Sequence, residues 1–188
     1  ELYQRLFGFA DQPFQPPRLN PPPGDWRPAG LPAAYRVLHP SAAWQRKTWA
    51  AEKWVSTLGR LDDSLPWLIT CGPTKWEIAL AGEIAQRSRP GQVINLAGQT
   101  SMQQFLAVIA GSQATLCVDG SASHISTAFG HPTLTLFGPT NATRWHNPGP
   151  NTICLKASDY TSEAKPSADV IPVDAVVAAA ASLLGEGA

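Results

Sequence analysis

The sequence has no excess of charge of either sign. Its 14 lysines and arginines balance its 14 aspartates and glutamates, so the formal net charge at pH 7 is zero. A protein that binds nucleic acid through bulk electrostatic attraction is usually basic over the surface that makes the contact. We therefore expect no nucleic-acid partner.

Cysteine is scarce, and metal-ligand patterns are missing. The three cysteines lie far apart in the sequence and form no Cys-x-x-Cys pair. An odd count at wide spacing argues against both a disulfide framework and a zinc site. None of the other three histidines stands at a metal-ligand spacing from His124. We expect free cysteines, no metal and a reducing, cytoplasmic setting.

Long apolar runs and the common catalytic loops are also absent. No stretch approaches the ~18 consecutive apolar residues of a membrane-spanning helix, and no signal peptide is visible. The sequence contains no Gly-x-Gly-x-x-Gly loop, no Walker A loop and no Gly-x-Ser-x-Gly elbow. The absence of the first two motifs excludes the commonest nucleotide-binding loops, and the absence of the third argues against a serine hydrolase.

Proline, in contrast, is abundant and unevenly placed. Nine of the 18 prolines fall within the first 40 residues, including the run Pro21–Pro23. Such a segment cannot sustain a helix or a central strand, and it behaves as a semi-rigid extended linker. We interpret residues 1–33 as an inter-domain linker with the end of a missing N-terminal domain, and residues 34–188 as one domain.

The rest of the chain alternates short apolar runs with amphipathic stretches. This alternation is typical of βαβ units and predicts an α/β fold, a Rossmann-like parallel sheet with helices on both faces. The expected strands are 35–38, 67–71, 93–96, 114–118, 133–137 and 152–155. The expected helices are 50–61, 75–88, 101–110, 124–129 and 173–184. The spacings Thr74-x-x-Glu77 and Ser101-x-x-Gln104 predict capping boxes.

Small polar residues follow two of the expected strands, in Asp119–His124 and in Phe137–Thr140. In an open α/β sheet, such turns meet at the carboxyl ends of adjacent strands, where ligands bind. Their exposed backbone N–H groups suit a phosphate. The first hypothesis is therefore a nucleotide-type ligand.

A loop after the first strand adds Ser41 and Lys47, a hydroxyl and a cation that suit a diphosphate. The alternative is a solvated loop anchored by Trp49. Glu77 has two readings: it completes a capping box with Thr74, or it accepts hydrogen bonds from a ribose.

His124 also has several readings: a general base, a phosphate donor or a structural histidine that holds its loop. Asp119 stands five residues before it across a turn, so a hydrogen-bonded Asp–His pair is sterically feasible. Such pairs are more often structural than catalytic.

Taken in order, these residues resemble the C-terminal half of family 9 glycosyltransferases, the ADP-heptose:lipopolysaccharide heptosyltransferases. The resemblance runs from about residue 35 to 155. Its matching pieces are Leu38–Ser41, Lys47–Trp49, Gly72–Pro73 with Glu77, Gly98–Met102, Val118–His124, Gly130–Pro132, Phe137–Thr140 and Trp145.

The resemblance implies one half of a GT-B architecture, in which two Rossmann-like domains face each other across a cleft. This half would bind the nucleotide-sugar donor, and a missing N-terminal domain would hold the acceptor and the catalytic base. The implied donor-binding residues are Ser41 and Lys47 at the diphosphate, Glu77 at the ribose, Thr100 near the adenine, Asp119 at the sugar, and Gly120, Ser121 and His124 beside it. No catalytic base and no cofactor are expected in this chain.

The implied reaction is inverting transfer of a sugar, heptose from ADP-heptose, to a lipopolysaccharide-type glycan. Lys47 would stabilise the leaving group. The resemblance also implies a bacterial, cytoplasmic protein, with peripheral association of the full-length protein at the inner membrane and a lipid-linked acceptor held by the missing domain.

The sequence departs from the family at Gly120–Ser121, where members usually read Ser or Thr and then Gly after the aspartate. Three other readings stay open: a non-catalytic nucleotide-sugar binding module, another GT-B-like enzyme such as a nucleotide-sugar epimerase, and an α/β domain with no ligand.

Overall fold

The fold is built on one six-stranded sheet in which every strand runs parallel to its neighbours. The computed structural model describes residues 17–62 and 64–186. The strand order is β3-β2-β1-β4-β5-β6, the doubly wound order of a Rossmann fold. The strands are β1 (Arg36–His39), β2 (Trp67–Ile69), β3 (Val93–Asn95), β4 (Thr115–Val118), β5 (Thr133–Phe137) and β6 (Thr152–Lys156).

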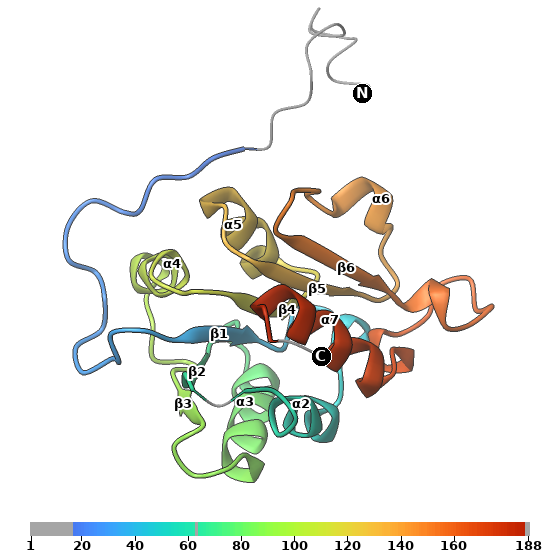
Figure 1. The fold of residues 1–188 in the computed structure, drawn as a ribbon, viewed down its shortest axis with the longest axis horizontal. Helices are drawn as coiled ribbons and strands as arrows, with labels where there is room; N and C mark the ends of the chain where they lie inside the picture. The colour runs from blue at the N-terminus through green and yellow to red at the C-terminus, as the bar shows by residue number, and fades with distance from the viewer. Residues whose placement is uncertain (1–16, 63, 187–188) are drawn as a thin grey trace, which may run out of the picture.

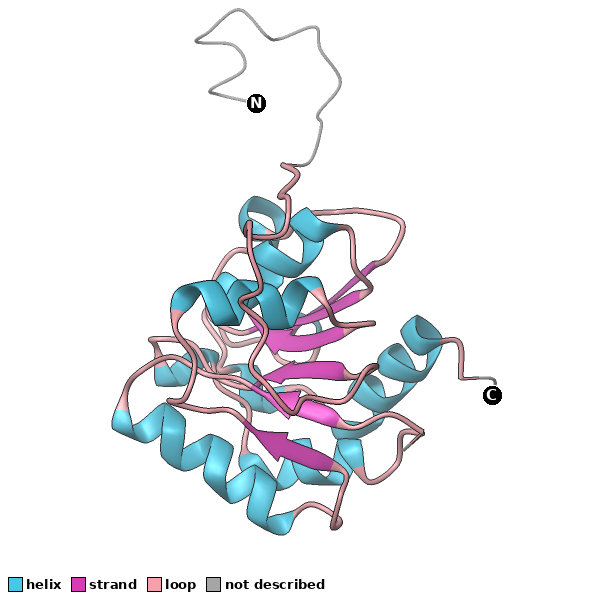
Figure 2. Ribbon diagram, turned by 90° about the vertical axis from the view of Figure 1, so that its left-hand side faces the viewer, coloured by secondary structure: helices cyan, strands magenta, loops and turns pink. Residues whose placement is uncertain are grey.

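Helices cover both faces of this sheet (Figures 1 and 2). They are α2 (Ala51–Leu58), α3 (Lys75–Arg87), α4 (Met102–Ala110), α5 (Ser121–Phe129), α6 (Ala142–Trp145) and α7 (Val173–Leu184), with 3-10 turns η1 (Gln45–Lys47), η2 (Ala157–Asp159) and η3 (Ala168–Val170). The expected α/β parallel sheet with helices on both faces is confirmed.

Two apolar layers hold the helices to the sheet. Leu38 on β1 faces the layer that contains α2, α3 and α7, whereas its neighbour Val37 faces the layer that contains α4. Successive residues of a strand point to opposite faces, so a strand covered on both sides is buried on both. The central strands β1 and β4 are accordingly buried at every position.

The predicted strands and helices all exist, most of them with shifted ends. The strand 133–137 and the helix 173–184 match β5 and α7. Helix α2 ends at Leu58 rather than at 61, because Gly59 takes the C-cap position. Helix α5 begins at Ser121, three residues before the predicted start, since Gly120 supplies its N-cap. The prediction missed α6 and the three 3-10 turns.

The proline-rich segment lies partly outside the described residues, which begin at 17. Residues 17–33 contain no helix or strand. The backbone N–H of Leu19 donates to the carbonyl of Ala128 on α5 at 3.0 Å, and Leu31 packs against the α4 layer. This part of the segment contains bends and a turn, and it contacts the domain.

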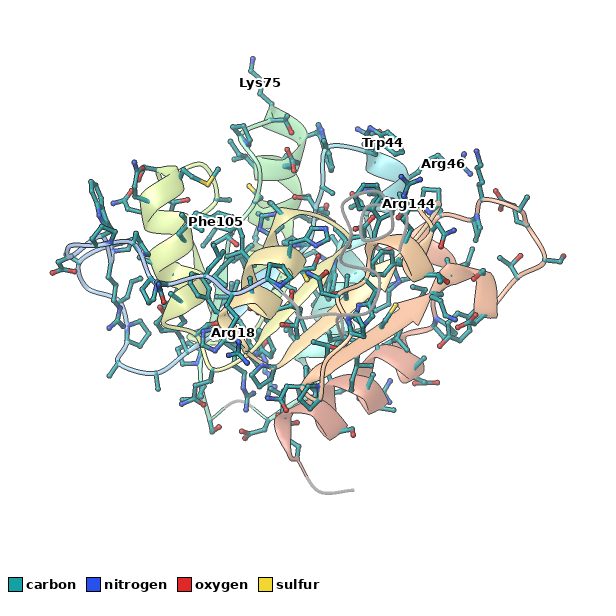
Figure 3. All side chains as sticks on the ribbon, turned by 90° about the horizontal axis from the view of Figure 1, so that it is seen from above. Arg18, Trp44, Arg46, Lys75, Phe105 and Arg144 are labelled. Carbon is teal, nitrogen blue, oxygen red and sulfur yellow. The ribbon has the colours of Figure 1, made fainter. Side chains whose placement is uncertain are left out.

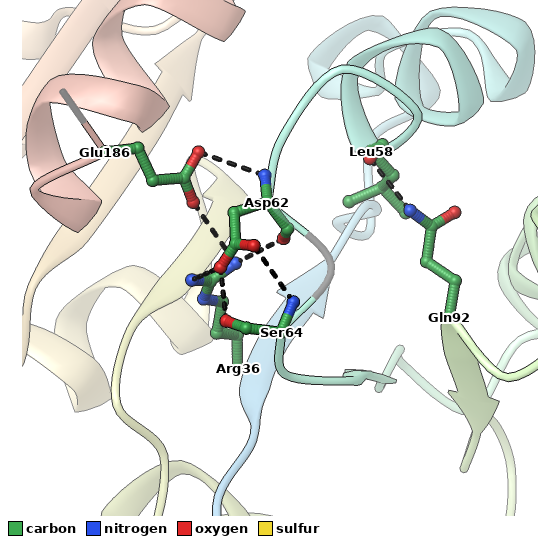
Figure 4. Close-up of polar contacts among 6 residues, drawn as sticks. All are labelled: Arg36, Leu58, Asp62, Ser64, Gln92 and Glu186. Carbon is green, nitrogen blue, oxygen red and sulfur yellow. Dashed lines mark hydrogen bonds and ion pairs between the residues drawn. The ribbon is translucent and has the colours of Figure 1, made fainter. Parts of the chain in front are cut away.

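Arg36 ties three segments together at the amino-terminal edge of the sheet (Figure 4). Its guanidinium donates to the carbonyl of Asp62 at 2.8 Å and forms ion pairs of 3.3 Å with the carboxylates of Asp62 and Glu186. The carboxylate of Glu186 also accepts from the backbone N–H of Asp62 at 3.1 Å. Since β1 begins here, this cluster lies at the edge opposite to the carboxyl ends of the strands.

Leu58 offers a test of the core. Its side chain is fully buried between α2 and the sheet, so truncation to Ala leaves a cavity. We expect Leu58→Ala to lower the free energy of unfolding by about 3 kcal/mol, measured by urea denaturation. Leu19→Ala is the control, because Leu19 is 45% exposed, and we expect it to cost less than about 1 kcal/mol. Equal losses in both variants would contradict this packing.

Candidate functional site

A cleft of about 740 Å³ opens at the carboxyl ends of the strands. The loops after β1, β2, β3 and β4 line it, as expected for a parallel sheet whose ligands bind at this edge. The structure brings together in this cleft all but one of the residues expected to bind a ligand: Ser41, Lys47, Glu77, Thr100, Asp119, Gly120 and Ser121.

Glu77 places a buried carboxylate on the wall of the cleft. Its side chain comes from the first turn of α3, and the residue is 3% exposed. The Ser41 hydroxyl donates to Oε1 at 3.1 Å, and the Thr74 hydroxyl donates to Oε2 at 2.6 Å. Thr74 is the N-cap of α3 but makes no side-chain capping bond, so the capping box predicted for Thr74 and Glu77 is wrong. The carboxylate is held by hydroxyls instead.

Gly72 explains why this carboxylate fits. A Cβ added at position 72 would lie 2.5 Å from Oε2 and 2.6 Å from Oε1 of Glu77. Any larger residue would therefore displace Glu77 from its two hydroxyl donors. The loop after β2 needs glycine at this position because of close approach.

Lys47 and Asp119 form an ion pair across the cleft. Lys47 Nζ lies 2.8 Å from Asp119 Oδ2, and the side chains are 18% and 4% exposed. The Thr140 hydroxyl donates to the same Oδ2 at 2.6 Å. The pair joins the loop after β1 to the loop after β4, and Thr140 adds the loop after β5. Thr140 stands in the predicted Phe137–Thr140 turn, but the sequence did not reveal its role as a partner of Asp119.

Two contacts fix the backbone of the stretch that carries Lys47. The indole N–H of Trp49 donates to the carbonyl of Ile171 at 3.0 Å. A Cβ at Gly138 would lie 2.9 Å from the carbonyl oxygen of Arg46 and 2.7 Å from the backbone nitrogen of Ala168, so this contact is as close as glycine allows. These contacts fix the backbone on both sides of Lys47.

An aromatic residue, Trp44, and a basic residue, Arg46, lie at the outer rim of the cleft beside Lys47. Trp44 is 64% exposed, and Lys47 Nζ lies 5.4 Å from the centroid of its ring. Trp44 and Arg46 project outward from the same stretch of chain (Figure 3). Lys75, at the start of α3, points away from the molecule in the same view and does not line the cleft. Of the residues 17–62 and 64–186 that line the cleft, Lys47 carries a positive charge.

The other end of the cleft is more apolar. Thr100, Met102 and Phe105 line it, and Met102 is 64% exposed. Ser101 caps α4 there: its hydroxyl accepts from the backbone N–H of Gln104, whose side chain accepts in return from the N–H of Ser101. The capping box predicted at this helix is confirmed. This end offers a partly apolar surface beside hydroxyl groups.

The N-terminus of α5 lies on the cleft at Gly120 and Ser121. No side chain caps this end, so the first N–H groups of the helix remain available as donors. Gly120 has φ −178°, an extended conformation that any residue adopts. A Cβ at this position would meet the Cβ of Ala42 at 3.5 Å, an ordinary contact. The backbone therefore does not require glycine at position 120.

His124 does not belong to the residues that line the cleft. Its Nδ1 lies 3.3 Å from the Asn147 amide nitrogen, which also donates to the Thr127 hydroxyl at 3.1 Å. The hydrogen-bonded Asp119–His124 pair considered from the sequence is absent among the described residues, since Asp119 bonds Lys47 and Thr140 instead. The structural interpretation of His124 fits this geometry.

Burial controls the titration of two cleft residues that sequence reasoning did not single out. Burial lowers the pKa of His39 to about 4, although the nearby Glu77 acts in the opposite direction. His39 Nδ1 lies 2.9 Å from the Thr70 hydroxyl. Burial likewise raises the pKa of Cys71 to about 11, and the charge of Glu77 adds to the effect. At pH 7 both side chains are neutral, so Lys47, Glu77 and Asp119 determine the charge of the cleft.

Within residues 17–62 and 64–186, no group of three or more His, Cys, Asp or Glu side chains is placed to hold a metal ion. In the same part of the chain, no helix has the length and apolar character needed to cross a membrane.

Comparison with known proteins gives a consistent result. The model of glycosyltransferase family 9 (heptosyltransferase) matches residues 10–170. Lipopolysaccharide heptosyltransferase 3 of Escherichia coli is 30% identical over 184 residues, which cover 88% of this chain and 54% of the relative. The chain thus spans about half the length of the curated relatives it matches most extensively.

Solved structures agree with the fold. The glycosyl transferase family 9 structure from Veillonella parvula superimposes with a TM-score of 0.70 at 20% identity, covering 84% of this chain and 48% of that one. The E. coli heptosyltransferase WaaC with ADP-2-deoxy-2-fluoro heptose gives a TM-score of 0.60 at 25% identity, covering 78% and 43%. In both, the matched part is less than half of the longer chain.

The buried His39 predicts a pH dependence of stability. Between pH 6.5 and about 4, the unfolded chain binds a proton that folded His39 does not accept. The free energy of unfolding therefore falls as the pH is lowered through this window, by up to ~3 kcal/mol from this residue. Urea denaturation of the wild type and of His39→Gln at pH 7.5, 5.5 and 4.5 isolates the effect. We expect the loss to be smaller in the variant; parallel curves would exclude it.

Proposed function

The chain belongs to glycosyltransferase family 9, and on that basis we propose that it forms the donor-binding half of an inverting glycosyltransferase. The proposed donor is ADP-heptose, and the proposed acceptor is a lipopolysaccharide-type glycan. The observation that carries the proposal is the convergence of Lys47, Glu77 and Asp119, from the segments that follow β1, β2 and β4, on one cleft at the carboxyl edge of the sheet.

We assign the diphosphate to the end of the cleft where Lys47 meets the start of α5. An ammonium group and unpaired backbone N–H groups at a helix N-terminus both attract phosphate oxygens. Ser41 was expected to contact the diphosphate as well. Its hydroxyl donates to Glu77, which supports a role in holding that carboxylate rather than a direct phosphate contact.

We assign the nucleoside to the opposite end. The Glu77 carboxylate, fixed by two hydroxyls on the cleft wall, can accept hydrogen bonds from a ribose diol. Thr100, Met102 and Phe105 offer the partly apolar surface on which a purine base can lie. The relatives support adenine, because WaaC has been solved with ADP and with an ADP-heptose analogue.

Asp119 then faces the sugar, with Gly120 and Ser121 beside it. We keep His124 out of this contact set, because it holds the loop through Asn147 and does not line the cleft. Its bond to Asn147 supports an indirect role, in which His124 steadies the helix that presents Gly120 and Ser121.

The chemical contribution of this half is stabilisation of the leaving group. When the bond between the sugar and the diphosphate breaks, the electron pair stays on the diphosphate, and the sugar passes through an oxocarbenium-like state. Lys47 and the N–H groups of α5 would stabilise the growing negative charge on the diphosphate. We expect the acceptor-activating base on the part of the relatives' length that this chain does not span.

We further propose that the complete enzyme works in the bacterial cytoplasm, at the inner face of the membrane that carries its lipid-linked acceptor. The E. coli relative, a lipopolysaccharide heptosyltransferase, supports this setting. The donor half itself would need no membrane contact.

Nucleotide binding tests the proposal. A ligand at about 100 times its Kd adds roughly 2.7 kcal/mol of stability, which for a domain of this size is on the order of 5–10 °C in Tm. We expect ADP and ADP-heptose to raise the Tm of this chain more than UDP or GDP. The increase should fall sharply in Lys47→Met and Glu77→Gln and persist in Lys156→Met, whose lysine is an exposed residue of β6. An equal response to every nucleotide, or none, would refute it.

A transfer assay on the same chain tests whether the catalytic base lies outside it. We expect this chain, incubated with ADP-heptose and a lipopolysaccharide acceptor, to transfer no sugar, because the base is assigned elsewhere. Detection of transferred heptose by mass spectrometry would overturn that assignment while leaving donor binding intact.

A further inference from the structure

The charge balance of the cleft is unfavourable for a nucleoside diphosphate. Among the described residues that line it, one is a cation, Lys47, and two are carboxylates, Glu77 and Asp119, while His39 is neutral at pH 7. Moreover, Lys47 is already paired with Asp119 at 2.8 Å. A diphosphate that uses Lys47 must compete with this buried carboxylate for the same ammonium.

Burial and hydrogen bonds hold the Asp119 side chain in its place. Its side chain is 4% exposed, its backbone N–H is bonded to the carbonyl of Leu136 at 2.9 Å, and Thr140 holds Oδ2 at 2.6 Å. Lys47, in contrast, reaches the cleft through a long flexible side chain from a braced backbone. A diphosphate that binds here would have to move or share the ammonium, while the hydrogen bonds of Asp119 keep it in place.

A buried carboxylate that loses a cationic partner needs other hydrogen-bond donors. Thr140 bonds only Oδ2, and no donor among the described residues bonds Oδ1. An intact nucleotide-sugar brings sugar hydroxyls to this end of the cleft, and they can donate to Oδ1. A nucleoside diphosphate brings none.

Sugar transfer increases the difference between the donor and the product diphosphate in how they interact with Asp119. The acceptor oxygen forms the new bond to the anomeric carbon, its proton goes to the base, and the electron pair of the broken bond stays on the terminal phosphate. The product therefore carries one more negative charge than the donor's diphosphate, at the end of the cleft nearest Asp119. The carboxylate repels this phosphate through a low-dielectric environment.

From this geometry we propose that Asp119 is a specificity-determining residue that makes the cleft prefer the intact nucleotide-sugar over the nucleoside diphosphate left after transfer. Without a sugar in the cleft, Asp119 stays paired with the Lys47 ammonium and cancels the charge that would attract the diphosphate. When a sugar is present, its hydroxyls hydrogen-bond Asp119 in place of the ammonium, and Lys47 can bind the diphosphate. The proposal rests on the proposed function, since it needs a nucleotide-sugar in this cleft. Its consequence is release of the product diphosphate.

Calorimetric titration of this chain with ADP and with ADP-heptose tests the idea. We expect the wild type to bind ADP-heptose about tenfold more tightly than ADP. In Asp119→Asn, Lys47 is freed from its counter-charge and the repulsion is gone, so ADP should bind about tenfold more tightly than it does to the wild type. The preference for ADP-heptose should then shrink toward equality.

Two variants serve as controls. Asp174→Asn makes the same chemical change at an exposed carboxylate on α7, and both affinities should stay at wild-type values. Thr140→Val leaves the charge of Asp119 in place but removes its second donor, so Asp119 holds Lys47 more strongly. We expect ADP affinity to fall about threefold, opposite in direction to Asp119→Asn.

The outcomes separate the two hypotheses. If the wild type binds neither ligand, the proposed function fails, and this inference falls with it. If the wild type binds ADP and ADP-heptose equally well, or if Asp119→Asn binds ADP no better than the wild type, donor binding survives and the role of Asp119 is refuted. If Asp119→Asn does not fold, the wild-type preference and the Thr140→Val result decide the question.

Discussion

All six strands run in the same direction, and the site depends on this constraint. Parallel strands bring their carboxyl ends to one edge, so the loops after β1, β2, β3 and β4 meet although they lie far apart in the sequence. The order β3-β2-β1-β4-β5-β6 places β1 beside β4, and this adjacency brings Lys47 within 2.8 Å of Asp119 across 72 residues of chain. The amino-terminal edge is left to structural contacts such as the Arg36 cluster.

Buried charge gives this edge its chemistry. Glu77 and Asp119 are both nearly inaccessible, and each is held by hydroxyl donors that keep the carboxylate fixed. Groups held in this way need little rearrangement when a ligand arrives, which is the condition for strong electrostatic stabilisation. Gly72 contributes to this arrangement, because a Cβ at position 72 would collide with the Glu77 carboxylate. As proposed, recognition of the ribose and the sugar would rest on these fixed carboxylates, and leaving-group stabilisation on Lys47 and the start of α5.

The sequence predicted the fold and most of the site because both depend on local patterns. Strand and helix alternation determines the parallel sheet, and polar residues directly after apolar runs must lie at its carboxyl edge. The failures involved partners that are distant in sequence. The sequence favoured Thr74 and Glu77 as a capping box, but Ser41 shares that carboxylate from another loop. The Asp119–His124 pair considered from proximity in sequence does not form, because Lys47 and Thr140 reach Asp119 first.

The central claim is that one cleft binds a nucleotide-sugar with its diphosphate at Lys47 and its nucleoside at Glu77. A crystal structure of this chain with ADP-heptose tests that claim most directly. We expect the ribose within hydrogen-bond distance of Glu77, the diphosphate between Lys47 and the start of α5, and the sugar against Asp119. A nucleotide bound outside the cleft, or bound inside it with the diphosphate turned away from Lys47, would contradict the account.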